Sequence, residues 1–96
     1  PDFARTPVMA GTGDGRDHHP RAWTMLMGGG NIPKGAVIGA TDDKGHKPTK
    51  DPAHLSSVVA TMYAAAGVDP ESAVYTGQGR PMQLITKGRA IRALVR

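Results

Sequence analysis

The chain of 96 residues contains no cysteine. This excludes thiolate nucleophiles, disulfide bonds and zinc centres with cysteine ligands, and it leaves the redox compartment open. Aromatic residues are also scarce, with one Trp, one Phe and two Tyr. Any core must therefore be built from Val, Leu, Ile, Met and Ala, and a chain of this length forms one domain at most.

Long apolar runs are missing as well. No stretch approaches the ~20 apolar residues that cross a bilayer, and no signal peptide is recognisable. We therefore expect no membrane partner.

The charge is moderately basic, with 12 Lys and Arg against 8 Asp and Glu, a net charge of +4. Such a balance suits an anionic partner, whether phosphate, sulfate or nucleic acid. Many of the cations crowd towards the C-terminus: Arg80, Lys87, Arg89, Arg92 and Arg96. Because few aromatic rings are present for base stacking, a solvated basic tail explains this charge and we do not expect nucleic-acid binding.

The first half of the chain predicts loops and short strands. Residues 1–20 have little periodicity and predict a loop. The apolar run 22–27, ended by three glycines, predicts a buried strand, and residues 36–42 predict a second strand. The polar stretch 43–52 predicts another loop.

The clearest element is an amphipathic helix over about residues 55–67. Its apolar positions recur at helical spacing, at Leu55, Val58, Val59, Met62, Tyr63 and Ala66. Ser56 or Ser57 is suited to cap its start, and for His54 we favour a structural or capping role over metal ligation. Gly67 is placed to end the helix in the left-handed conformation.

The fold class predicted from this order is α/β, a small sheet with one main helix. Residues 82–86 predict a strand, Lys87 and Gly88 a turn, and residues 89–96 a short strand or helix. One helix covers only one face of a sheet, so an apolar strand at 22–27 implies a partial domain. We therefore expect self-association through an uncovered sheet face or edge.

The stretch "GRDHHP" holds the most reactive side chains. In an extended segment His18 and His19 point to opposite sides, so only one of them faces a given site. Asp17 is suited to bind a metal or to accept a hydrogen bond from an imidazole, and Arg16 to bind an oxyanion. By chemistry alone, a hydrogen-bonded structural loop is favoured over a functional site, and Asp2 and Arg5 are favoured as part of an exposed terminus.

Four longer segments of the sequence resemble those of a known protein family. The segments "DFARTP", "GRDHHPRAWTMLMGGGNIPKGAVIGATDDKG", "PAHLSSVVATMYAAAGVDP" and "GQGRPMQLITKGRAI" occur in that order. Together they resemble the C-terminal part of the bacterial domain-of-unknown-function family DUF1501. That family is similar to the alkaline phosphatase and sulfatase superfamily, which implies a mostly parallel sheet between helices and a metal centre at the strand ends.

The resemblance also implies roles for particular residues. His18 resembles a metal-binding histidine of the superfamily, with Asp17 and Asp2 as further ligands of a divalent Zn, Mn or Ca ion. Phe3 stands where a second ligand histidine is expected, so the centre is altered or has lost one ligand. Arg5 and Arg16 would contact an anionic small-molecule substrate.

Two interpretations stay open. In the first, residues 1–96 form a single partial domain of a metal-dependent phosphate- or sulfate-ester hydrolase. It would be inactive alone, because the superfamily places its nucleophile N-terminal of this region. In the second, the chain is a non-catalytic binding or structural protein on the same fold, which the loss of the histidine at Phe3 favours. Whether the protein is an enzyme is left open, and the resemblance implies an extracytoplasmic location.

Overall fold

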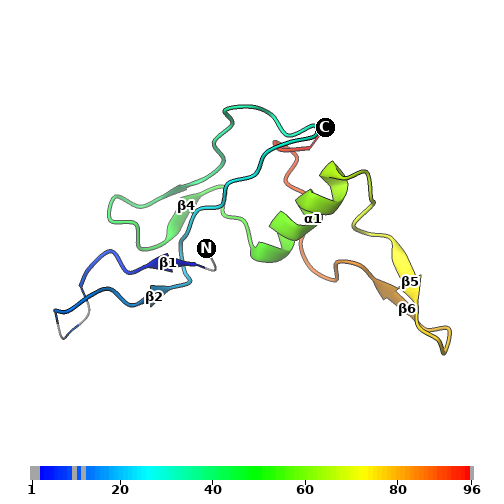
Figure 1. Ribbon diagram of the computed structural model, residues 1–96, viewed down its shortest axis with the longest axis horizontal. Coiled ribbons are helices and arrows are strands. Elements are labelled where there is room, and N and C mark those ends of the chain that lie inside the picture. The colour runs from blue at the N-terminus through cyan, green and yellow to red at the C-terminus, as the bar shows by residue number, and fades with distance from the viewer. Residues whose placement is uncertain (1–2, 10, 12, 96) are drawn as a thin grey trace. The chain divides into compact units, whose positions relative to one another are not determined.

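The computed structural model describes residues 3–9, 11 and 13–95. This part of the chain contains one α-helix and three two-stranded antiparallel sheets, labelled in Figure 1. The predicted mixed α/β content is therefore present. The mostly parallel sheet implied by the resemblance is not found in this part of the chain, where the three sheets are separate antiparallel ladders of two strands. No helix of the described residues has the length and apolar character needed to span a membrane.

The chain divides into two compact units. Unit 1 comprises Pro1–Met27 and Val37–Pro52, and unit 2 comprises Gly28–Ala36 and Ala53–Arg96. Each unit is described by itself below.

Unit 1 begins with a hairpin. Strand β1 (Ala4–Arg5) pairs antiparallel with β2 (His18–His19), so that Ala4 lies opposite His19 and Arg5 opposite His18. The N–H of Thr6 donates to the carbonyl of Asp17 at 2.9 Å and extends the pairing. The loop predicted over residues 1–20 is therefore wrong at these positions, because two short segments satisfy each other's backbone groups.

The second sheet of unit 1 joins β3 (Ala40–Thr41) to β4 (Pro48–Lys50), with an irregular register between Ala40 and Thr41. The strand predicted over 36–42 is thus reduced to two residues, and the loop predicted over 43–52 contains β4. Gly39 precedes β3 with φ +84°, and a Cβ there would lie 3.1 Å from the Lys50 carbonyl oxygen. Only glycine accepts both this backbone angle and this close approach.

The strand predicted over 22–27 does not form. Residues 23–27 carry no backbone hydrogen bond to any other described residue. Ala22 is buried, whereas Leu26 is 100% exposed. The prediction is wrong because a strand exists only when a neighbour completes its hydrogen bonds, and the described residues supply none here.

Unit 2 is built on helix α1 (Leu55–Ala65), as predicted. Its N-cap is His54, whose Nδ1 accepts a hydrogen bond from the Ser56 N–H at 3.2 Å. The capping role expected of His54 is confirmed, and the expectation that Ser56 or Ser57 caps the helix is wrong. Gly67 has φ +83°, and the Val68 N–H donates to the Tyr63 carbonyl at 2.9 Å. The helix therefore ends in the left-handed turn that glycine favours.

The buried side of α1 differs from the predicted apolar face. The fully buried residues are Ala60 and Thr61, whereas Leu55 and Met62 are exposed, Met62 by 53%. The Thr61 hydroxyl donates to the Ser57 carbonyl at 2.6 Å and accepts from the Ile91 N–H at 2.9 Å. The backbone at Ile91 approaches α1 on this side. Such a close approach requires small side chains on the helix rather than large apolar ones.

A hairpin and a turn complete unit 2. Strand β5 (Ala73–Tyr75) pairs antiparallel with β6 (Pro81–Gln83). The pairing continues where the Leu84 N–H donates to the Ser72 carbonyl at 3.0 Å. The strand predicted over 82–86 is therefore confirmed only at residues 82 and 83, and β6 begins one residue earlier. Residues 89–95 form neither the predicted strand nor a helix but contain a single turn, in which the Leu94 N–H donates to the Ile91 carbonyl at 2.9 Å.

Replacing Thr61→Val removes the hydroxyl and leaves the Ile91 N–H without its acceptor. We expect a loss of about 1–3 kcal/mol in the free energy of unfolding, the usual cost of an unsatisfied buried group. Urea unfolding followed by helix circular dichroism measures it. Thr61→Ser keeps the hydroxyl and should preserve slow hydrogen exchange at the Ile91 amide. Equal exchange rates in the two variants would contradict the bridging role.

Gly88→Ala should destabilise unit 2 by about 1–3 kcal/mol, the cost of a side chain at left-handed φ. Gly88 has φ +88°, and a Cβ there would lie 2.6 Å from the Ser56 Oγ and 2.8 Å from the Ser57 nitrogen. Gly77→Ala is the matched control, because no heavy atom lies within 4 Å of its Cβ position. Thermal unfolding should separate the two variants, and similar melting temperatures would show that Gly88 does not limit the packing at the start of α1.

Candidate functional site

The β1–β2 hairpin positions most of the residues predicted for a site. Arg5 and His18 are directly opposite in the ladder, and side chains at opposite positions leave the same face of a two-stranded sheet. Along β2, His18 is exposed and His19 is buried. The expectation that the adjacent histidines face opposite sides is confirmed.

The two imidazoles have different surroundings. The His18 ring packs against the Phe3 ring, with centroids 4.7 Å apart and planes inclined by 54°. The Nε2 of His19 lies 3.0 Å from the His46 carbonyl oxygen. Because a carbonyl only accepts, Nε2 of His19 carries the proton of this hydrogen bond. His19 thereby ties β2 to the loop before β4, and His18 remains the candidate for a ligand.

Arg16 closes the hairpin beyond β1 and β2. Its Nη1 donates to the Thr6 carbonyl at 2.8 Å and to the Pro7 carbonyl at 2.6 Å. A guanidinium has five N–H donors, so this contact uses part of its capacity. Arg16 therefore has a structural role, and its predicted contact with an anion stays a prediction. For Arg5, which is exposed, the hairpin geometry leaves the side chain on the outer face with His18.

The carboxylate of Asp17 is bound to the backbone. Its Oδ1 accepts from the His18 N–H at 2.7 Å, and its own N–H donates to the Thr6 Oγ1 at 3.1 Å. Alternation along the chain directs the Asp17 and His18 side chains to opposite faces, so Asp17 orients the backbone rather than the His18 imidazole. Asp2, the third predicted ligand, lies outside the described residues.

No group of three or more His, Asp or Glu side chains suited to a metal ion occurs among residues 3–9, 11 and 13–95. The described donors thus do not assemble a three-ligand set around His18. The metal centre implied by the resemblance stays a prediction.

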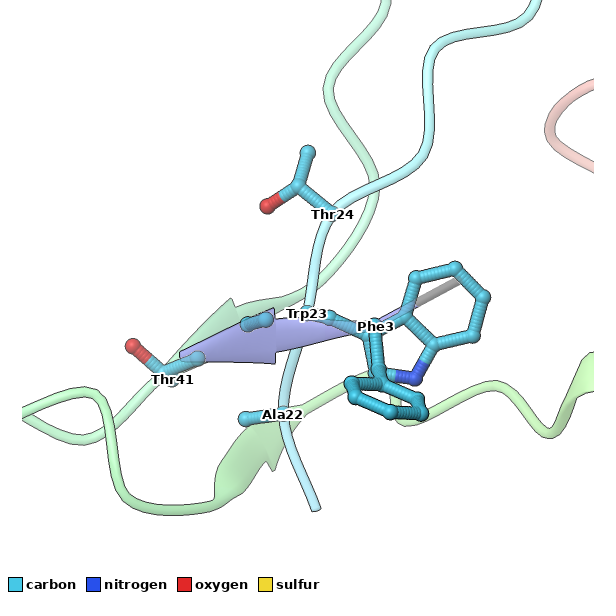
Figure 2. Close-up of a pocket in the computed structure, with 6 residues that line it drawn as sticks. Phe3, Ala22, Trp23, Thr24 and Thr41 are labelled. Atoms are coloured by element: carbon cyan, nitrogen blue, oxygen red, sulfur yellow. The ribbon is translucent and has the colours of Figure 1, made fainter. Parts of the chain in front are cut away.

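A cavity of about 350 Å³ lies in unit 1 beside this hairpin. Its lining residues come from β1 and the residue before it, from β3, and from the segment after β2. Figure 2 shows them as sticks: Phe3, Ala4, Ala22, Trp23, Thr24 and Thr41. From the sequence, Phe3 is expected only at the position of a missing ligand and Trp23 in a buried strand, so the cavity is not predicted. The one signal for the cavity was that the single Phe and the single Trp of the chain both flank the histidine motif.

The loop between β3 and β4 is ordered by Asp42. Its Oδ1 accepts from the His46 N–H at 2.8 Å, and its carbonyl accepts from the Gly45 N–H at 3.1 Å. The hydrogen bond from the His46 N–H is the main reason that the pKa of Asp42 lies below its ordinary value. This loop in turn presents the His46 carbonyl to His19.

Residues 1–95 match the family described as Protein of unknown function (DUF1501). The chain belongs to the DUF1501 family. The match confirms the resemblance carried by the quoted segments, and it assigns no activity, because the description of DUF1501 is one of unknown function. No curated protein and no solved structure gives a significant match to this DUF1501 chain.

Acid should loosen the Asp42 loop of this DUF1501 chain. The pKa of Asp42 is lower in the folded state than in the unfolded state. The stabilisation is therefore complete above the unfolded value of about 3.9 and is lost as pH falls through the folded pKa. We expect the His46 amide resonance to shift with a midpoint below pH ~3.9. In Asp42→Asn this midpoint should vanish, and its persistence would assign the titration to another group.

Proposed function

We propose that this chain carries the anion-recognising part of a phosphate- or sulfate-ester hydrolase and does not complete the reaction alone. The observation that supports this most directly is the exposed pair of Arg5 and His18, held opposite each other across the hairpin. Membership of DUF1501 and the resemblance of that family to alkaline phosphatases and sulfatases supply the reaction class.

The pair has the chemistry that oxyanions require. Arginine remains charged at all ordinary pH values and offers parallel N–H donors that match the oxygens of phosphate or sulfate. Imidazole adds a further hydrogen-bond donor. No hydrogen bond to a His18 ring nitrogen is found within the described residues, so this side chain is available to a ligand.

A divalent metal would polarise the ester oxygen and help to generate a nucleophile if one were bound. Among the described residues the donors around His18 do not form a metal-binding group, and the Asp17 carboxylate is engaged by a backbone N–H. We therefore derive no catalytic step through a metal ion. Arg5 binds and orients the anionic group, and His18 holds or releases a proton beside it.

The aromatic ring of Phe3, in place of a ligand histidine, favours a second candidate function, which is anion binding without catalysis. The resemblance places a ligand histidine at this position, but here an aromatic ring packs on the His18 imidazole. In this alternative the same pair binds an anion without turning it over, and the chain belongs to a non-catalytic binding protein.

Calorimetric titration with inorganic phosphate and with sulfate at low salt tests anion recognition. We expect Arg5→Gln to weaken binding by about tenfold, close to the loss of one charge-assisted hydrogen bond. Arg21→Gln is the matched control, since Arg21 lies in the same unit and is exposed. Equally weakened anion binding in Arg5→Gln and Arg21→Gln would show that the effect depends only on net charge. That result would contradict the Arg5 and His18 site.

A measurement of ester hydrolysis distinguishes the hydrolase from the non-catalytic binding protein. The protein expressed from its complete gene should hydrolyse nitrophenyl phosphate or nitrophenyl sulfate, and His18→Ala should abolish that activity. Hydrolysis that is unchanged in His18→Ala would exclude His18 from the reaction. Anion binding with no hydrolysis in the presence of Zn, Mn or Ca would establish the non-catalytic alternative.

A further inference from the structure

We propose that the cavity lined by Phe3 and Trp23 binds an uncharged, flat ring carried by the anionic ligand. The ligand of the Arg5 and His18 pair is then an ester of a ring-bearing alcohol, not a bare inorganic anion. This inference rests on the proposed anion recognition and adds the substrate class.

The walls of the cavity suit a ring. Two aromatic side chains, Phe3 and Trp23, line it together with the small side chains of Ala4 and Ala22. Figure 2 shows the two rings at one end of the cavity, with Thr41 at the other. A volume of about 350 Å³ is at the lower end of the range for small-molecule sites. It therefore fits one ring better than a larger group.

The lining of the cavity favours an uncharged occupant. None of its lining residues is ionisable. The polar side-chain groups of its lining residues are the hydroxyls of Thr24 and Thr41 and the indole N–H of Trp23. The Thr41 hydroxyl already donates to the Asp42 carbonyl at 3.0 Å. Aromatic faces attract another ring in offset or edge-to-face geometry. The cavity therefore favours an uncharged ring with at most a few polar substituents.

Phe3 connects the cavity to the anion-recognising pair. It lines the cavity, and its ring also packs on His18 at 4.7 Å. Arg5 lies two residues further along the same extended segment, which places it on the same side as Phe3. A ligand with its ring against Phe3 thus directs its anionic group towards Arg5 and His18.

The single tryptophan of the chain makes this testable directly. Because Trp23 is the only Trp and lines the cavity, its intrinsic fluorescence reports occupancy. The probes are phenyl phosphate, inorganic phosphate and phenol. We expect phenyl phosphate to shift the Trp23 emission and to bind about tenfold more tightly than either fragment, the gain that one aromatic contact provides.

Two variants separate the cavity from the anion pair. Trp23→Leu should reduce the affinity for phenyl phosphate to that for inorganic phosphate, measured by calorimetry, while inorganic phosphate binds as before, because Trp23 lines the cavity. Tyr75→Leu is the control, because Tyr75 is an exposed aromatic residue in the other unit. If Trp23→Leu fails to fold, the exposed Thr24 can be changed instead, since Thr24→Leu narrows the cavity and should have the same selective effect.

The outcomes distinguish the inference from the proposed function. Phenyl phosphate that binds no more tightly than inorganic phosphate would overturn the ring site and leave anion recognition intact. Phenol that binds as tightly as phenyl phosphate would uphold a ring site and overturn the anionic substrate class. If none of the probes binds by fluorescence or calorimetry, both the inference and the proposed function are wrong.

Discussion

The hydroxyl of Thr61 bridges the Ser57 carbonyl in α1 and the Ile91 amide in the C-terminal segment. It is also the largest fully buried side chain among the described residues, so packing in unit 2 depends on a polar contact rather than on a cluster of apolar groups. His19 has the same role in unit 1, where its imidazole donates a hydrogen bond to the His46 carbonyl. Each such hydrogen bond contributes only about 0.5–1.5 kcal/mol, so each unit is held by several modest contacts.

This dependence on polar contacts sorts the hairpin residues into two groups. The side chains of Arg16, Asp17 and His19 form hydrogen bonds with backbone groups. These hydrogen bonds maintain the shape of the loops. Arg5 and His18 lie opposite each other in the ladder, and both are exposed. A motif that looks like one reactive cluster in the sequence therefore contains three side chains bound to backbone groups and an exposed histidine.

Local rules predicted the helix well, because its spacing, the position of His54 and the left-handed Gly67 are set by neighbouring residues. They failed for residues 22–27, because pairing depends on a partner that composition does not reveal. They also failed for the buried face of α1, where a backbone segment packs against Ala60 and Thr61 instead of covering Met62. The cavity was missed for a similar reason, since Phe3 and Trp23 are distant in sequence and only the hairpin brings them together.

The buried apolar residues of the described part are Ala22 and Ala60, both small. Unfolding this part of the chain therefore exposes little new hydrocarbon to water. The heat capacity change of unfolding arises mainly from such exposure and averages about 12–15 cal/mol/K per residue in ordinary domains, and the denaturant slope follows the same surface. We expect both the heat capacity change and the denaturant slope to be small for this chain. The free energy of unfolding should therefore vary little with temperature, and the urea transition should be broad.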